Sequence, residues 1–336
     1  MKRRAFILTE LLTSMMLQTL FVLTLCGAFY MLVSFSTSTQ QILAAHDEGQ
    51  IVISYIESRI RNAGLGLWGC RTPENIRKAF KNVSAITGDK LALPVAITTN
   101  KKPEESTKTG KIYKGNYLTL LYAHKDGGQY TLFTENTTTV SISNNINSSG
   151  NNFTLLGGKS AYTGSRFGGG GNNQDISNYA AIESSGYPVY LMPESVTGQH
   201  VRILSTTSDN VDIHPMSELL NIECERIYVS DSSGGRSFMV SNLGLNSSGK
   251  ADWNAQKPHT KGILEIYMEL DTTPDIPIFS IKVLVSEGIR SDTNKTPRPE
   301  DWPDEYWKPH KSEFEVHKVH VSRASWKLYN LEPFTY

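Results

Sequence analysis

The chain has 336 residues, and its 33 lysines and arginines balance its 33 aspartates and glutamates. Because no net charge remains, the composition gives no support to a general binder of nucleic acid or of anionic surfaces. About 300 residues follow the apolar N-terminal stretch, which is enough for one large domain or two modest ones with a real core.

The first 35 residues combine a basic leader with a long apolar run. The leader Lys2–Arg4 precedes the bond between Ala5 and Phe6, and the segment Leu11–Phe35 contains no acidic, basic or histidine residue. As a helix, this segment would measure about 37 Å, longer than the roughly 30 Å hydrocarbon core of a bilayer. The sequence therefore predicts a membrane-spanning helix.

The placement of charge predicts the orientation of that helix. Lys2–Arg4 lie before it, whereas the first charged residues after it are Asp47 and Glu48. By the positive-inside rule, the N-terminus stays in the cytoplasm and the rest of the chain is exported. Glu10 does not fit a plain anchor, because an ionisable group at the edge of an apolar run costs free energy unless something offsets it.

The leader resembles the processing site of type IV prepilins. A short basic leader ends in a small residue, Phe6 follows, and Glu10 is the fifth residue after the break. The resemblance implies that prepilin peptidase cuts between Ala5 and Phe6 and that Phe6 becomes N-methylated. The family usually has glycine where this chain has Ala5, so the efficiency of cleavage is in question. The alternative is an uncleaved signal anchor in which Glu10 is a tolerated interfacial charge.

Glu10 is expected to act in assembly and not in catalysis. Cleavage before Phe6 would create a positively charged amino terminus, and that group of one subunit can pair with Glu10 of a neighbour inside an apolar filament core. A buried carboxylate without a partner costs several kcal/mol. Glu10 would therefore favour the axial register that pairs it.

Residues 36–63 are predicted to continue the helix in amphipathic form, after local loosening at the polar stretch Ser34–Thr39. Gly64 and Gly66 are expected to end it. Packing of the apolar face on the chain's own globular domain is the favoured use of this face, ahead of packing on a partner. Its apolar face follows alternating steps of four and three residues through Ile42, His46, Gly49, Ile53, Ile56, Ile60 and Ala63.

The segment Arg61–Cys70, Arg-Asn-Ala-Gly-Leu-Gly-Leu-Trp-Gly-Cys, narrows the resemblance. It is similar to the stretch after the long helix in PilW-type minor pilins, where an Arg and an Ala-Gly pair lead into Gly-Cys. The J-type pseudopilins of type II secretion are related but usually shorter. The resemblance covers residues 1–70 and, loosely, the closing stretch Trp326–Asn330.

Residues 64–336 are predicted to form an exported, β-rich, pilin-like domain, so that the fold class is α+β: a long N-terminal helix followed by a large antiparallel sheet. The residues around 264–270 and 279–285 alternate in polarity and predict a hairpin. Irregular apolar phase predicts bulges or two strands within 313–328. Further strands are expected at 117–122, 129–134, 200–205, 226–230 and 236–241.

Two loops stand out in this domain. Residues 137–178 are rich in Asn, Ser, Gly and Thr and are predicted to form a long insertion, for which a solvated spacer is favoured over a contact surface. The segment Pro297–Trp307 mixes prolines, which exclude regular structure, with aromatic residues that favour burial. We expect it to be pinned to the sheet; exposed, it would be a contact patch.

The chain has three cysteines, of which Cys26 lies in the apolar run. Outside the cytoplasm, Cys70 and Cys224 can pair, and a disulfide is favoured over two thiols. In the chain-entropy model, a loop of that length contributes roughly 5 kcal/mol as an upper figure.

Motifs for chemistry are missing or incomplete. Gly158-Lys159-Ser160 lacks the glycine that a phosphate-binding loop needs at Phe153, and no zinc-protease, paired-cysteine or nucleophile-elbow motif occurs. His317 and His320 would face opposite sides of a strand, and the acidic pair around Asp212 lacks a full calcium loop. The sequence predicts no enzyme, no cofactor and no metal site.

The resemblance implies a structural minor pilin of the bacterial inner membrane, with a single span, a cytoplasmic N-terminus and a periplasmic domain. Residues 1–5 would be the leader and 6–35 the span. After cleavage, the protein would help to initiate assembly of a type IV pilus and enter it near the tip. Its partners would be other minor and major pilins, prepilin peptidase and the inner-membrane assembly platform. The alternatives are a J-type pseudopilin of a secretion or DNA-uptake machine and a membrane-anchored adhesin or binding domain.

Overall fold

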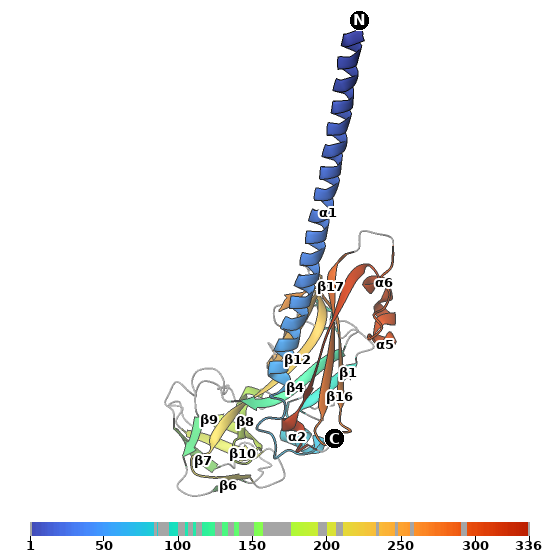
Figure 1. The fold of residues 1–336 in the computed structure, drawn as a ribbon. Coiled ribbons are helices and arrows are strands. Elements are labelled where there is room, and N and C mark those ends of the chain that lie inside the picture. The colour runs from blue at the N-terminus through green and yellow to red at the C-terminus, as the bar shows by residue number, and fades with distance from the viewer. Residues whose placement is uncertain are drawn as a thin grey trace.

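The computed structural model has the α+β fold class that the sequence predicts, a long N-terminal helix followed by antiparallel sheets (Figure 1). It describes all residues other than 1, 84–85, 87–93, 100–104, 107–109, 112–115, 125–129, 134–137, 141–150, 157–175, 194–199, 206–210, 233–234, 246–247, 256–258, 290–293 and 335–336.

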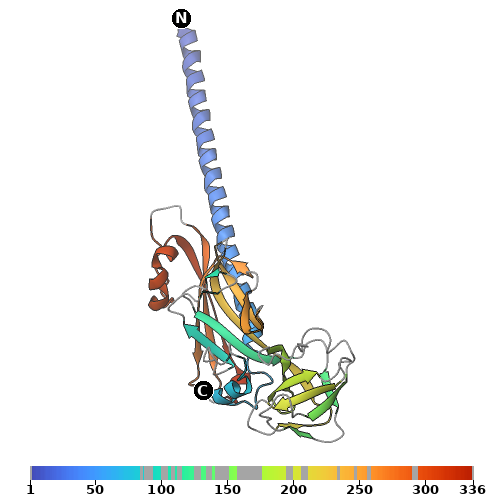
Figure 2. The same cartoon turned by 180° about the vertical axis from the view of Figure 1, so that it is seen from behind.

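Helix α1 runs without a break from Lys2 to Ile60. Its first half projects from the molecule and its second half lies against the sheets (Figures 1 and 2). The predicted loosening at Ser34–Thr39 is wrong. Thr37 and Thr39 donate their hydroxyls to the carbonyls of Val33 and Phe35, each at 2.9 Å, so these polar side chains are satisfied within the helix.

The central strand of the main sheet is β12, Glu218–Ser232. Its residues 221–227 pair with β4, Asn116–His124, and its residues 225–232 pair with β13, Gly235–Leu245. The sheet extends beyond them through β1, Val95–Thr99, and through β14, Ala251–Ala255, and β15, Thr260–Lys261. Three of the strands predicted from alternation, at 117–122, 226–230 and 236–241, are confirmed here.

The beginning of β12 belongs to a second, closed arrangement. It pairs with β5, Tyr130–Phe133, on one side and with β8, Tyr179–Ile182, on the other. Three strands complete the ring in the order β7, Asn151–Leu156, β10, His200–Ser205, and β9, Pro188–Pro193. This ring forms the end of the molecule farthest from the N-terminus (Figures 1 and 2).

The segment 137–178 is therefore more than a spacer. Its described residues include β7, which belongs to the ring. They also include the short strand β6, Thr138–Val140, and the single turn η1, Ile176–Asn178. Strand β6 pairs with β11, Val211–Ile213. The composition of the segment did not reveal this strand, because β7 has only six residues. The glycine run 168–171 lies outside the described residues.

A separate sheet of three strands closes the domain, in the order β16, Ile263–Asp271, β17, Ile278–Ile289, and β18, His317–Lys327. The hairpin that the sequence predicts joins β16 to β17. The prediction of strand from residue 313 is corrected, because Lys311–Phe314 forms the short helix α6. The bulge lies in β17, between Ser286 and Gly288, and not in β18.

The Pro297–Trp307 segment is pinned as predicted. Trp302 and Trp307 are buried in a cluster with Leu264, Leu284 and Phe314. The segment is less irregular than its prolines indicate, because Asp304–Trp307 forms α5 and Lys308–His310 forms η2. The remaining short elements are α2, Pro73–Ala79, η3, Tyr329–Leu331, and the strand pair β2, Glu105–Ser106, and β3, Gly110–Lys111.

Candidate functional site: a projecting apolar helix and its base

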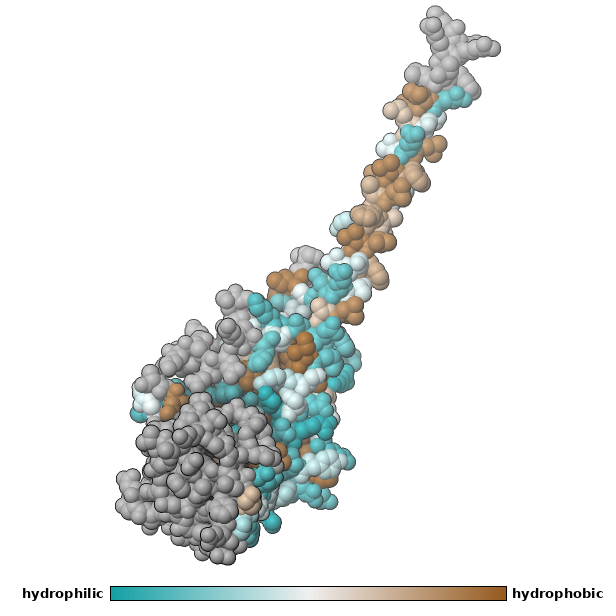
Figure 3. Space-filling view, turned by 90° about the vertical axis from the view of Figure 1, so that its left-hand side faces the viewer, coloured by the Kyte–Doolittle hydropathy of each residue, from teal (hydrophilic) through white to brown (hydrophobic). Residues whose placement is uncertain are grey.

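The projecting half of α1 presents apolar side chains on every side. Large apolar residues from Leu11 to Phe35 are 45–76% exposed. Figure 3 shows them as a mainly brown column, whereas the coloured residues of the domain in that view are mostly teal. A contiguous apolar surface of this kind is expected to be covered by lipid or protein. The helix is long and apolar enough to span a membrane.

Two threonines inside this column have their hydroxyls satisfied within the helix. Thr19 donates its hydroxyl to the carbonyl of Met15 at 2.7 Å, and Thr24 donates to the carbonyls of Leu20 and Phe21. Because each hydroxyl has an acceptor in the preceding turn, the helix can enter an apolar surrounding without leaving these groups unsatisfied.

Glu10 lies on the projecting helix with an exposed side chain. It makes no ion pair with any residue whose side chain the structure describes. Its backbone carbonyl accepts a hydrogen bond from the Thr13 hydroxyl at 3.0 Å, so the backbone around it is regular helix. The Ala5–Phe6 bond lies one turn earlier in the same helix. The structure thus places Ala5, Phe6 and Glu10 in one continuous helix. The projecting half of this helix is called the rod below.

The second half of α1 forms the base of that rod. Ile53, Ile56 and Ile60 are buried against the sheets, as the periodicity predicts, and Ala45 and Val52 join them. Ile42 and His46 belong to the predicted stripe but are exposed. His46 instead lies 5.7 Å from the ring of His320 on β18, measured between centroids. The docked part of the stripe therefore begins near Ala45 and not at Ile42.

Gly49 allows the close approach of α1 to the C-terminal sheet. A Cβ added at Gly49 would overlap the Ser322 hydroxyl and lie 2.9 Å from the Ser322 Cβ on β18. We expect Gly49→Ala to lower the free energy of unfolding by about 1–3 kcal/mol, because the packed sheet has to shift. Gly27→Ala is the matched control, since nothing lies within 4 Å of its added Cβ. Equal stability of the two variants in denaturant titrations would contradict this packing.

The segment Arg61–Cys70 is the joint between α1 and the sheets. The Gly64 N–H donates to the carbonyl of Leu121, and the Ala123 N–H donates to the carbonyl of Leu65, so the segment pairs with β4. Gly64 and Gly66 have φ of +76° and +70°, values that favour glycine. Helix α1 ends at Ile60, before the predicted end at residue 63, and Gly64 and Gly66 lie in the turn segment that follows it. Sequence reasoning missed that they also fit against other parts of the chain.

Both glycines sit where a side chain would not fit. A Cβ at Gly64 would lie 2.9 Å from Leu331 and Phe334 near the C-terminus, and one at Gly66 would lie 2.8 Å from Ala123. The Asn330 side-chain amide donates to the carbonyl of Arg61 at 2.6 Å. The segment Arg61–Cys70 thus fixes the direction in which α1 leaves the domain.

An ion pair joins the base of α1 to the main sheet. Arg59 of α1 lies 3.3 Å from the buried carboxylate of Glu225 on β12 and over the ring of Tyr55. Burial raises the pKa of Tyr55, and the neighbouring Glu225 charge adds to that rise. Leaving Glu225 without Arg59 would bury an uncompensated charge. The pair therefore fixes α1 on the main sheet.

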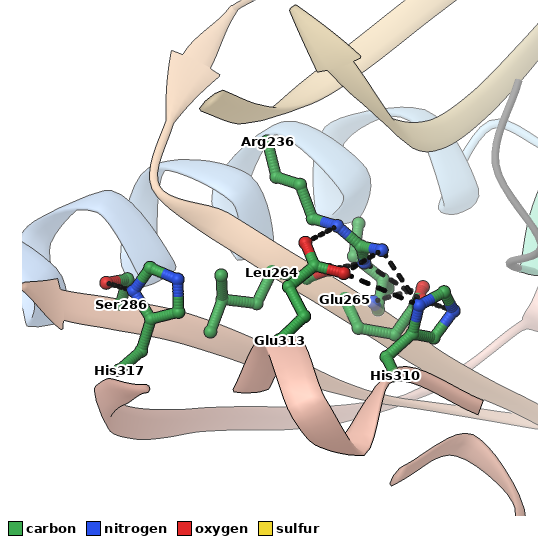
Figure 4. A network of polar contacts seen from close by, with 8 residues as sticks. Arg236, Leu264, Glu265, Ser286, His310, Glu313 and His317 are labelled. Atoms are coloured by element: carbon green, nitrogen blue, oxygen red, sulfur yellow. Dashed lines mark hydrogen bonds and ion pairs between the residues drawn. The ribbon is translucent and has the colours of Figure 1, made fainter. Parts of the chain in front are cut away.

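A second polar cluster joins the main sheet to the C-terminal segment (Figure 4). Arg236 of β13 lies 2.7 Å from Glu313 of α6 as an ion pair, and it donates to the carbonyl of Leu264 at 2.5 Å and contacts His310 Nδ1 at 2.9 Å. Glu265 of β16 lies 3.7 Å from the same guanidinium. The hydrogen bond from His310 and the Arg236 charge lower the pKa of Glu313.

Burial raises the pKa of Glu265 to about 7, against its ordinary value of 4.5. The folded chain therefore holds a proton there that the unfolded chain releases above pH 4.5. The stability due to this group is full below pH 4.5 and is lost as the pH rises through 7. We expect the stability of the wild type, relative to Glu265→Gln, to fall by at most about 3 kcal/mol between pH 5 and pH 8.

Urea titrations at several pH values measure this difference. Glu269→Gln on the same strand removes an exposed carboxylate and is the control that should keep the wild-type pH dependence. A stability difference between wild type and Glu265→Gln that does not change with pH would show that Glu265 is ionised in the fold.

In the Arg236 cluster, the side chains of Arg236, Glu265 and His310 are buried, and that of Glu313 is 40% exposed. A cleft of about 200 Å³ lies elsewhere, between β12, η1 and β13, and is lined by Asn221, Glu223, Asn242 and apolar neighbours. The histidines noted in the sequence separate: His310 joins Arg236, His317 contacts Ser286, and His320 faces His46. Within the described part of the chain, no group of three or more metal-binding side chains converges.

Cys70 and Cys224 are both buried in the main hydrophobic core, and the structure carries them as thiols. The disulfide stays a prediction. If it forms after export, alkylation of the unfolded, unreduced protein labels only Cys26, and reduction lowers the free energy of unfolding by up to roughly 5 kcal/mol. Labelling of all three cysteines before reduction would contradict the bond. Cys70→Ser is the control that removes the effect of reduction.

Comparison with protein-family models, with curated proteins and with solved structures finds no match for this chain. What the fold and the site define is an α+β protein that carries one N-terminal helix long and apolar enough to span a membrane.

Proposed function

We propose that this chain is a PilW-like minor pilin. It is inserted in the bacterial inner membrane, cut by prepilin peptidase between Ala5 and Phe6, and built into a type IV pilus near its tip, where it helps to initiate assembly. Its work is recognition and packing, without a catalytic step. Its partners are other minor and major pilins and the inner-membrane assembly platform.

One observation carries the proposal: a bare apolar rod with a single carboxylate near its start. A helix that serves only as an anchor needs no charge inside its apolar end, and Glu10 costs free energy there. A filament of parallel helices gives that carboxylate a partner, the amino terminus of a neighbouring subunit. The leader Lys2–Arg4 and the Ala5–Phe6 bond stand at the positions that this mechanism requires.

The base of the helix supports the same proposal. Docking into a filament requires that the rod and the domain keep a fixed relative direction. Gly49, the Arg59–Glu225 pair and the paired joint at Gly64 each fix α1 on the sheets. An adhesin tethered to a membrane has no comparable need for a rigid, uninterrupted rod.

The experiment is to shear pili from cells that express an epitope-tagged chain and to probe the pilus fraction. We expect the tagged protein there, and we expect deletion of its gene to lower the number of pili. A chain that is absent from pili, and whose deletion blocks protein secretion or DNA uptake while pili remain, would instead be the J-type pseudopilin.

A further inference from the structure

One end of the C-terminal sheet extends along α1 toward the rod. A Cβ added at Gly49 would lie 3.3 Å from the Val285 side chain on β17, and one added at Gly288 would lie 3.7 Å from the Gln41 side chain. From Val285 to Gly288, β17 thus runs toward the N-terminus of α1. Figure 1 shows this end of β17, together with α6, on the side of the domain from which the rod leaves.

This end of the sheet carries exposed apolar side chains. Strand β17 ends at Ile289, which pairs with His317, the first residue of β18. Ile289 is 76% exposed, and Val316, which precedes His317, is 48% exposed. Lys318 beside them is also exposed. These four residues, Ile289, Val316, His317 and Lys318, are called the sheet tip below.

The length of α1 places the sheet tip close to the bilayer that the rod can span. The apolar run ends at Phe35, and Gln41 lies six residues further on, which is about 9 Å along a helix. Ile289 follows Gly288 in the strand and lies roughly 3 Å nearer to the bilayer than Gly288 does. The headgroup layer extends about 5–7 Å beyond the hydrocarbon core on each side. With the end of the span at Phe35, the sheet tip lies at the level of the headgroups.

The charged residues around the sheet tip are of both signs. Lys295 and Lys311 lie 2.9 and 3.6 Å from the carboxylate of Glu315. Lys318 is exposed and Glu287 is partly exposed, and neither makes an ion pair within the described residues. A layer of phospholipid headgroups offers phosphate to the lysine and, in many lipids, ammonium to the carboxylate. The charges of this surface therefore suit a headgroup layer.

We propose that the sheet tip rests on the bilayer surface, with Ile289 and Val316 in the headgroup layer of the leaflet from which α1 emerges. The span brings this surface to the sheet tip in every molecule, whereas a protein partner would have to be met by diffusion. Because the contact is intramolecular with respect to the anchored helix, even two exposed apolar side chains are sufficient to favour it.

The contact gives the domain a second attachment to the membrane and limits the tilt of the domain relative to the bilayer. The proposal rests on the membrane span of α1. It does not rest on cleavage before Phe6 or on entry into a pilus, so either proposal can fail while the other holds.

The test uses the full chain in nanodiscs of phosphatidylcholine and phosphatidylglycerol in equal amounts, with a small fraction of lipid that carries a nitroxide on its headgroup. A fluorescent label is attached to Ile289→Cys in a Cys26→Ser background, in which the other two cysteines are buried. The matched control is Tyr329→Cys, which is 61% exposed and lies just beyond the opposite end of β18. We expect the nitroxide to quench the label at position 289 and not the one at position 329, roughly 35 Å further from the bilayer.

Two changes separate a contact from closeness alone, both read with the label at position 289. Val316→Asp places a charge in the contact and should reduce the quenching, whereas Met216→Asp, at an exposed residue in the turn before β12, should not. Insertion of Glu-Ala-Ala-Ala-Lys-Ala-Ala after Thr39 lengthens α1 by about 10 Å and should abolish the quenching, while the docked part of α1 keeps its sequence.

Three results would overturn the proposal. The first is equal quenching of the labels at positions 289 and 329. The second is quenching at position 289 that Val316→Asp leaves at the level of Met216→Asp, which would show closeness without contact. The third is quenching that persists after the insertion, because the sheet tip would then reach lipid by a route other than the one that α1 sets.

Discussion

Glu10→Ala is expected to lower the amount of this protein in sheared pili about tenfold or more, while its insertion in the membrane and its cleavage continue. The exposed apolar rod would still enter the filament core, but the charged amino terminus of the neighbouring subunit would have no partner there. An uncompensated buried charge costs several kcal/mol, and 1.4 kcal/mol corresponds to a factor of ten. Immunoblots of the pilus and membrane fractions measure the ratio.

Thr13→Val provides the control for this prediction. Thr13 lies one turn after Glu10, and its hydroxyl donates a hydrogen bond to the Glu10 backbone carbonyl at 3.0 Å. The variant therefore removes a polar group from the same stretch of helix without removing the carboxylate, and it should enter pili normally. Normal incorporation of Glu10→Ala as well would reject the role of Glu10 in setting register.

Trp302→Ala is expected to lower the free energy of unfolding by about 3–5 kcal/mol, the range for removing a large buried aromatic side chain. Trp302 is fully buried and is one of the two tryptophans in the cluster between β16, β17 and α5. Its loss would leave a cavity beneath the segment that the Arg236 cluster also holds. Thermal and urea unfolding of the full chain in detergent measure the change.

Trp302→Phe separates packing from hydrogen bonding at this position. The indole N–H of Trp302 is buried and has no acceptor among the described residues, so phenylalanine removes an unsatisfied donor while it keeps an aromatic ring. We expect a loss below about 1.5 kcal/mol. A loss as large as that of Trp302→Ala would show that the indole contributes more than apolar packing.

The helix and its burial could be predicted because they depend on local periodicity. Ile53, Ile56 and Ile60 follow a helical period, and a helix with one apolar face requires a surface to cover that face. Ile42 has the same period and remains exposed, because the extent of the covering sheet depends on β17 and β18, more than 200 residues away. Periodicity therefore shows which face of a helix is buried, but it does not show where along the helix the covering sheet ends.

The closed ring and the joint could not be predicted, because each depends on pairings between distant segments. The sequence predicts a strand only at 226–230, whereas β12 begins at Glu218. Its first residues pair with β5 and β8 and its later ones with β4 and β13. The Gly64–Gly66 segment carries turn signals only. That it also pairs with Leu121 and Ala123 depends on the register of β4.

The candidate site also combines residues that a local sequence pattern identifies with residues that only distant contacts bring together. Ala5, Phe6 and Glu10 form a local pattern, and the sequence is sufficient to name them. The Arg236–Glu313 pair joins residues 77 positions apart, and nothing local marks Arg236 as buried. The position of the sheet tip also follows from the packing of β17 on α1 and not from the composition of either element.

The mature N-terminus tests the central claim most directly. Intact-mass and peptide mass spectrometry of the protein from its native membrane should find a chain that begins at Phe6 with a methylated amino group. A chain that begins at unmodified Met1 would contradict the pilin proposal, because Glu10 would then have no mature amino terminus at the required distance and the helix would serve as an anchor.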